Sequence, residues 1–230
     1  MNNFLADIML TMDSYKNLIS DVKKKKSVIS LNGIIEEGLG HFLYSVDFHM
    51  PGEKIFITYS EQRGKKVYED LKNLGLENVY FFPKKEDFFY NSIARSLDSS
   101  NDQIKALWAM IHKSPIIITT AEACLDKLVT KDNFDLNSFI IEFSDIIEIG
   151  ELSKRLIKSG YENVPTVEGK GQFSVRGGII DIFPPISENP YRIELFGDEI
   201  DSIRIFDPIS QRSIENVEYV EVSPAIQNVL

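Results

Sequence analysis

Residues 171–213 constrain the fold of this chain more than any other segment. The segment is dense in β-branched and aromatic residues, and Gly-Gly, Pro-Pro and Asn-Pro pairs interrupt it at short intervals. Short apolar runs separated by turn residues are typical of antiparallel strands joined by tight turns. The sequence therefore predicts a set of short antiparallel strands in the C-terminal part of the chain.

The run YRIELF at residues 191–196 predicts a strand with two different faces. Successive side chains of a strand point to opposite sides, and the apolar side should face the core. The side chains expected on the core side are those of Tyr191, Ile193 and Leu195. The other side then carries Arg192 and Phe196 side by side. Such a pair is typical of a docking surface, because a few Arg and aromatic anchors carry most interface energy. The alternative is that helices of the same chain cover this side.

The first 130 residues show a different pattern, in which short apolar runs alternate with segments of helical spacing. The runs expected to be strands are residues 28–31, 54–59, 79–82 and 116–119. A helix is expected over residues 3–18, another begins after the cap Ser60 and stops at Gly75, and the capping-box spacing of Thr119 and Glu122 predicts one that ends at Val129. Strands alternating with helices imply a parallel sheet with helices on its faces.

Turn residues cluster at residues 131–138, and the pattern after them is α+β. We therefore expect an α/β fold of two domains. The first, residues 1–137, is a parallel-sheet domain with helices on both faces. The second, residues 138–224, is a smaller α+β domain with an antiparallel sheet.

The net charge of −10 and the single cysteine limit the classes of function. An acidic surface repels nucleic acid, so tight DNA binding by this chain alone is not expected. One cysteine, Cys124, excludes an internal disulfide framework and suits a reducing cytoplasm, and we expect it to be a buried small hydrophobe. The histidines and Cys124 have no metal-ligand spacing, so no metal site is expected. No apolar run approaches the length that crosses a bilayer, and the N-terminus lacks the basic region of a signal peptide. The sequence predicts a soluble, cytoplasmic protein without a membrane partner.

Three motifs carry a family resemblance: FSVRGGIIDIFP at residues 173–184, ENPYRIELFGDEIDSIR at residues 188–204, and FDPISQRS at residues 206–213. They closely resemble the module shared by bacterial transcription-repair coupling factors and the excision-repair protein UvrB. The likeness is greatest to the N-terminal region of the coupling factors. A weaker likeness runs back through residues 81–120, so the resemblance covers most of the chain.

The resemblance implies UvrB-like domains 1a and 2, the first of them a degenerate P-loop-type domain, with residues 225–230 starting a returning segment, 1b. In that family the module docks onto UvrA through two arginines and a phenylalanine, which by motif fall on Arg176, Arg192 and Phe196. It further implies an intramolecular contact with the rest of a longer protein. RNA polymerase and DNA would be bound, and ATP used, by domains outside this chain.

Residues 32–40 stand where UvrB carries its nucleotide-binding loop. A phosphate-cradling loop needs G-x-x-x-x-G-K-[ST], in which the lysine neutralises phosphate charge and the hydroxyl holds magnesium. The residues of the corresponding loop here are Gly33, Glu36, Glu37, Gly38, Leu39 and Gly40. The two glycines keep their spacing, but Leu39 replaces the lysine and Gly40 the hydroxyl residue. Glu36 and Glu37 add negative charge where a polyanion would bind. The sequence therefore predicts a degenerate loop, with no cofactor.

The resemblance, together with the degenerate loop, implies a non-catalytic protein-interaction module, not an enzyme, that recruits UvrA to stalled RNA polymerase in transcription-coupled nucleotide excision repair. The alternative is a fragment of a UvrB-like, ATP-dependent repair enzyme that binds damaged DNA. Measurable nucleotide binding by the chain would favour that alternative.

Overall fold

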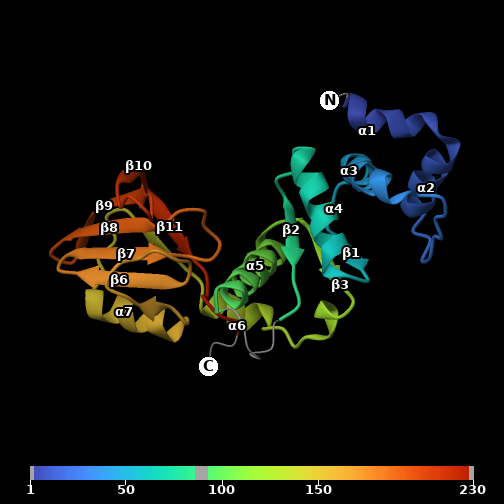
Figure 1. Cartoon of the computed structure of the whole chain (residues 1–230). Coiled ribbons are helices and arrows are strands. Elements are labelled where there is room, and N and C mark those ends of the chain that lie inside the picture. Colours follow the sequence, from blue (N-terminus) through green and yellow to red (C-terminus); the bar gives the residue numbers. More distant parts are fainter. Residues whose placement is uncertain (1–2, 86–92, 228–230) are drawn as a thin grey trace. The chain divides into compact units, whose positions relative to one another are not determined.

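The computed structural model describes residues 3–85 and 93–227 (Figure 1). The chain divides into two compact units: Met1–Lys84 with His112–Leu125, and Lys85–Ile111 with Asp126–Leu230. A small parallel sheet in the first unit and antiparallel strands in the second confirm the predicted mixed α/β class. No helix in the described ranges is long and apolar enough to cross a membrane.

The first unit is built on a parallel sheet with the strand order β1-β3-β2. Its strands are β1 (Lys54–Thr58), β2 (Val79–Phe82) and β3 (Ile116–Thr120). Its helices are α1 (Phe4–Asp7), α2 (Asp13–Lys23), α3 (Leu39–His49) and α4 (Glu61–Asn73), with 3-10 turns η1 (Ile8–Thr11), η2 (Glu36–Gly38) and η3 (Ala123–Leu125). The central strand β3 is buried along its whole length. Three of the four predicted strands are confirmed.

Helix α4 begins and ends where the sequence predicts. The Ser60 hydroxyl accepts a hydrogen bond from the Arg63 N–H at 3.4 Å and caps the start of the helix. Gly75, at φ +87°, follows its end, a left-handed conformation that glycine adopts without strain. Val67 and Leu71 are buried in the core that this helix shares with the sheet.

The strand predicted at residues 28–31 is wrong. These residues lie outside any helix or strand, and Val28 is 86% exposed. An apolar run becomes a strand only where a neighbouring strand satisfies its backbone groups, and the described part of the first unit offers it none. The helix predicted over residues 3–18 is interrupted, because Met12 is extended between η1 and α2.

The helix predicted to end at Val129 is also wrong, and only the short turn η3 forms there. The Thr119 hydroxyl donates to the Phe82 carbonyl at 2.9 Å, so it holds the sheet together instead of capping a helix. The neighbouring Thr120 hydroxyl caps η3. Cys124 lies on this turn and is exposed, which corrects the expectation that it is buried.

The second unit holds a six-stranded sheet with the order β10-β9-β8-β7-β6-β5. Its strands are β5 (Glu162–Asn163), β6 (Gln172–Arg176), β7 (Ile179–Phe183), β8 (Tyr191–Phe196), β9 (Glu199–Phe206) and β10 (Ser213–Val217). A separate antiparallel pair consists of β4 (Phe139–Glu142) and β11 (Tyr219–Val222). The helices are α5 (Ile93–His112, whose last residue belongs to the first unit), α6 (Lys131–Leu136) and α7 (Ile149–Lys158). All neighbours in the large sheet are antiparallel except β5 and β6, which confirms the predicted antiparallel sheet.

Helix α6 forms where the sequence predicts a cluster of turns. The Thr130 hydroxyl accepts from the Asn133 N–H at 3.4 Å and caps the helix, and Phe134 is fully buried. A cap and a buried aromatic anchor are enough to hold this short helix. The domain limits proposed after residues 137 and 224 remain predictions.

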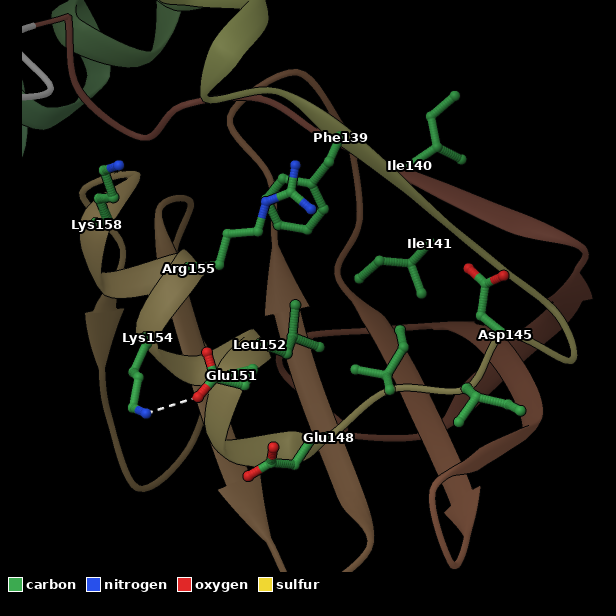
Figure 2. A pocket seen from close by; sticks show the side chains of 12 residues that line it. Phe139, Ile140, Ile141, Asp145, Glu148, Glu151, Leu152, Lys154, Arg155 and Lys158 are labelled. Carbon is green, nitrogen blue, oxygen red and sulfur yellow. Dashed lines mark hydrogen bonds and ion pairs between the residues drawn. The ribbon is translucent and has the colours of Figure 1, made fainter.

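One face of the six-stranded sheet carries the core of the second unit. Strands β7 and β8 and helix α7 contribute buried side chains: Ile180, Ile182, Ile193, Leu152 and Leu156. Ile141 of β4 joins the same core. The Arg155 guanidinium of α7 lies 3.8 Å from the centre of the Phe139 ring of β4, so the helix and this strand are neighbours (Figure 2). Helix α7 and the β4–β11 pair therefore cover the core face of the sheet.

Lys170 is a half-buried cation whose charge the folded chain disfavours. Lys105 of α5 lies close to it and bonds Glu188 at 2.6 Å. Burial first, and Lys105 second, lower the pKa of the Lys170 ammonium from its ordinary 10.5 to about 8. Between these two values the unfolded chain binds the Lys170 proton more tightly than the folded chain does. This group therefore destabilises the fold fully below pH 8, and the penalty disappears as the pH rises to 10.5.

We expect Lys170→Met to raise the free energy of unfolding more at pH 7 than at pH 10, because the variant removes a penalty that the wild type has already lost at high pH. Urea denaturation at the two pH values measures the difference. Lys131→Met, at an exposed position of α6, is the matched control and should show no such pH dependence. An equal effect of Lys170→Met at both pH values would contradict the lowered pKa.

Candidate protein-interaction site

Strand β8 presents two chemically different faces, as its alternation predicts. Ile193 is fully buried, and Tyr191 and Leu195 pack against the same core. The pairing of β8 with β9 shifts by one residue between Glu194 and Leu195. The extra residue of this bulge lies on β9, so the side chains of β8 keep alternating between its two faces. Arg192 and Phe196 therefore project from the opposite face, which we call the outer face. Glu194 lies between them in the strand, so they share that face without being adjacent.

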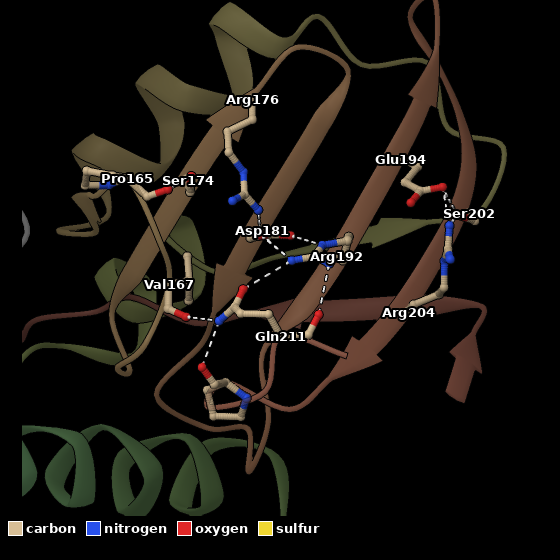
Figure 3. A network of polar contacts seen from close by, with 11 residues as sticks. Pro165, Val167, Ser174, Arg176, Asp181, Arg192, Glu194, Ser202, Arg204 and Gln211 are labelled. Atoms are coloured by element: carbon tan, nitrogen blue, oxygen red, sulfur yellow. Dashed lines mark hydrogen bonds and ion pairs between the residues drawn. The ribbon is translucent and has the colours of Figure 1, made fainter. Parts of the chain in front are cut away.

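The centre of the outer face is a carboxylate that the sequence analysis missed. Asp181 of β7 is fully buried, and its carboxylate accepts from Arg176 Nη2 at 2.5 Å and from Arg192 Nε at 2.7 Å and Nη2 at 2.9 Å (Figure 3). Two of the three predicted docking residues thus converge on one side chain. The signal was present in the sequence, because a single aspartate within the apolar strand IIDIF must be paired if that strand is buried.

Arg192 is held on its other sides as well. Its guanidinium lies 4.5 Å from the centre of the Phe206 ring, and it donates to the backbone and side-chain oxygens of Gln211, both at 3.3 Å. Gln211 is fixed in turn by a bond to the Val167 carbonyl at 3.1 Å. The hydrogen bonds to Asp181 raise the pKa of the Arg192 guanidinium. Only 17% of the Arg192 side chain is exposed, so most of its hydrogen-bonding capacity is used inside the chain.

Arg176 and Phe196 lie at the same end of the sheet. Arg176 ends β6 and pairs with Ile179, which in turn pairs with Glu194, two residues before Phe196. The turn after Arg176 contains Gly177 at φ +61°, which confirms the predicted tight Gly-Gly turn. The Arg176 side chain is 46% exposed and Phe196 is 85% exposed. Both side chains are therefore available to a partner that approaches this end of the outer face.

For Arg176 and Phe196 the alternative, in which helices cover the outer face, does not hold, because both side chains are exposed. Helix α7 packs on the core face, and the outer face is partly closed by a small cluster of Val167, Phe183 and Phe206 under neighbouring loops. Beside Arg192, Arg204 of β9 forms an ion pair with Glu194. The outer face therefore has a fixed polar centre and an exposed aromatic residue at its end.

The degenerate loop of the first unit carries an ion pair. Arg63 of α4 donates from Nε to both carboxylate oxygens of Glu36, at 2.9 and 3.0 Å, and its guanidinium lies over the rings of Phe56 and Tyr59. The hydrogen bond from Arg63 lowers the pKa of the Glu36 carboxyl. Leu39 starts helix α3 and is buried. Arg63 is therefore bound to a carboxylate of the loop itself.

We expect titration of magnesium-ATP into the chain to give no saturable heat of binding. The loop has no lysine for the phosphates, and Glu36 both occupies Arg63 and repels a polyanion. Isothermal titration calorimetry measures this directly, with an intact P-loop protein as the positive control. Binding in the micromolar range would contradict the prediction and favour the ATP-using alternative.

Residues 139–227 match the family model of the UvrB interaction domain. These residues belong to the UvrB interaction domain family. The chain is also 30% identical to the transcription-repair-coupling factor of Bacillus subtilis over 95% of its length, and 36% identical to that of Myxococcus xanthus over 88%. A coupling factor of Staphylococcus aureus matches 76% of the chain at 31% identity. The chain spans less than a fifth of the length of these relatives, 19%, 18% and 15% respectively.

These matches confirm the resemblance to the UvrB-like module of the coupling factors. The UvrB interaction domain contains the whole outer face, including Arg176, Asp181, Arg192 and Phe196. It also contains β4 and α7, which cover the core face.

Proposed function

We propose that this chain is a non-catalytic protein-interaction module, the N-terminal UvrB-like part of a longer transcription-repair coupling factor. It recruits UvrA to stalled RNA polymerase in the bacterial cytoplasm during transcription-coupled nucleotide excision repair. The observation that carries the proposal is the outer face of the UvrB interaction domain, where two arginines are fixed on one buried carboxylate and a phenylalanine is exposed at the same end. RNA polymerase, DNA and ATP are assigned to other parts of the longer protein.

The three predicted residues have different parts in this proposal. Phe196, 85% exposed, is the anchor that fills an apolar pocket on UvrA. Arg176 bonds Asp181 through one nitrogen in the structure, and its remaining donors suit a carboxylate or carbonyl group of the partner. Arg192 is the support that positions the other groups, because its own donors are occupied.

In the longer protein the same outer face is proposed to contact the remainder of the chain when repair is not under way. An exposed phenylalanine on the same face as fixed arginines suits an internal partner as well as UvrA. UvrA would then compete with this intramolecular contact. The isolated module lacks the competing part and should bind UvrA more tightly than the longer protein does.

Titration of purified UvrA into the chain tests the proposal. Saturable binding, lost in a variant that carries Arg176→Ala and Phe196→Ala together, supports a recruiting role for the outer face. No binding by the wild-type chain at micromolar concentrations would overturn it, and the resemblance would then stand for the fold alone.

A further inference from the structure

A second surface of the UvrB interaction domain is an open groove between α7 and β4, with a volume of about 690 Å³ (Figure 2). Its floor is apolar and comes from β4, α7 and the segment between them: Phe139, Ile141, Ile147 and Leu152. Two large apolar side chains remain exposed at its lining, Ile140 at 53% and Ile146 at 83%. Exposed aliphatic residues next to an apolar floor mark a surface that a partner can cover.

Three acidic and three basic side chains line the groove, and they differ in their hydrogen-bond partners. Lys154 bonds Glu151 at 2.7 Å, and Asp145 accepts from the Glu142 N–H at 2.9 Å. Arg155 and Lys158, one turn apart on α7, have no ion-pair or hydrogen-bond partner for their side chains among the side chains that the structure describes, those of residues 3–85 and 99–227. Although the chain has a net charge of −10, one end of this apolar groove therefore carries two positive charges that can attract an acidic partner.

The stacking of Arg155 prepares it to bind an anion. Its guanidinium lies over the Phe139 ring at 3.8 Å, which restricts its orientation while its in-plane donors remain free. A guanidinium held in this way matches the two oxygens of a carboxylate, and part of the ordering cost of binding is already met by the stacking. Lys158 adds a second positive charge next to it.

The backbone of β4 offers a further contact. The strand pairs with β11 on one edge, where the Phe143 N–H donates to the Glu218 carbonyl. In an antiparallel pair every second residue bonds to the partner strand, so the N–H and carbonyl of Ile140 point to the other edge. Among the described strands none pairs with that edge. An extended segment can therefore bond to the strand as well as lie on the apolar floor.

We propose that this groove binds an extended peptide segment of a partner protein in which a carboxylate side chain and a bulky aliphatic side chain stand two residues apart, on the same side of the segment. The carboxylate bonds Arg155 and is attracted by Lys158, and the aliphatic side chain covers Leu152 and Ile147. The three acidic residues that line the same groove, Asp145, Glu148 and Glu151, exclude a nucleic-acid backbone, since a row of phosphates would be repelled. A peptide with isolated carboxylates avoids that repulsion.

The groove is separate from the surface proposed to bind UvrA. Its floor residues Ile141 and Leu152 belong to the core that Ile180 and Ile193 join from the sheet, whereas Asp181 and Arg192 point to the outer face. The two surfaces therefore lie on opposite sides of the sheet. A partner in the groove and UvrA on the outer face can bind at the same time.

The test is an NMR titration of the isotope-labelled chain with a capped synthetic hexapeptide that carries one glutamate and, two residues away, one leucine in an otherwise uncharged sequence, so that both side chains face the same side. We expect amide shift changes in residues 139–158, saturation at millimolar peptide, and affinity reduced by about tenfold or more in both Arg155→Glu and Lys158→Glu. Lys131→Glu, an exposed charge reversal on α6, is the matched control and should bind as the wild type does. Lys158 is exposed, so its variant keeps the test valid if loss of the Arg155 stacking disturbs the fold.

Three outcomes would overturn the proposal. One is equal binding of the same hexapeptide with lysine in place of the glutamate, because charge complementarity would then have no part. Another is unchanged affinity in both charge-reversal variants, and the third is an absence of shift changes in residues 139–158. UvrA binding, measured separately with the same variants, should remain unaffected. A failure of the peptide-binding proposal can therefore be told apart from a failure of the proposed UvrA recruitment.

Discussion

Asp181→Ala is expected to lower the free energy of unfolding by about 3 kcal/mol, because it removes one partner of a buried ion pair. The wild-type carboxylate is fully buried and accepts three hydrogen bonds from two arginines. Without it, the guanidinium of Arg192 stays largely buried and loses its strongest partner. Urea denaturation followed by circular dichroism measures the loss.

Asp201→Ala is the matched control for this substitution. Asp201 lies on β9 of the same sheet and is exposed, so its loss should change the free energy of unfolding by less than about 0.5 kcal/mol. Asp181→Asn tests the charge separately, since it keeps the shape and some of the hydrogen bonds. A similar, small effect of Asp181→Ala and Asp201→Ala would show that the arginines find other partners and that the network is not structural.

Asp181→Ala should also weaken UvrA binding, although the buried Asp181 side chain cannot touch a partner. Arg176 and Arg192 would be released from their common carboxylate and would pay a larger ordering cost on binding. Because folding is also affected, binding has to be measured at a temperature and urea concentration at which the variant is fully folded.

Phe196→Ala is expected to reduce the affinity for UvrA by about thirtyfold, or about 2 kcal/mol, as for a central aromatic anchor. The free energy of unfolding should hardly change, because the side chain is 85% exposed in the isolated chain. Calorimetric titration of UvrA and urea denaturation of the same protein preparation separate the two effects.

Leu125→Ala provides the matched control, since Leu125 is 86% exposed and lies in the first unit. It should leave both affinity and stability as in the wild type. Unchanged UvrA affinity in Phe196→Ala would rule out Phe196 as the anchor and leave the exposed donors of Arg176 to explain any binding.

Arg192 requires a different interpretation from Phe196. Its side chain bonds Asp181 and Gln211 and stacks on Phe206, so Arg192→Ala removes internal contacts together with any contact to a partner. A loss of affinity in that variant is compatible with either role. The comparison with Phe196→Ala, in which only a partner contact is lost, distinguishes an anchor from a support.

Much of the fold could be predicted because its signals are local. The strands near residues 54–59, 79–82 and 116–119, and the two faces of β8, follow from the spacing of apolar residues along a few consecutive positions. The predictions that failed depended on what the segment meets in space. Residues 28–31 have the composition of a strand but no partner strand in the described part, and Thr119 has the spacing of a cap but uses its hydroxyl on Phe82.

The sequence by itself determined the antiparallel sheet, the side of β8 on which Arg192 and Phe196 project, and the absence of a phosphate-binding lysine at Leu39, since each depends only on residue type and period. The tertiary structure alone decided that Arg176 and Arg192 share Asp181, that Gln211 completes their network, and that Arg155 stacks on Phe139 above an open groove. These contacts join residues from different elements, and their partners are set by strand register and by the packing of α7, which the spacing of residues along one segment does not contain.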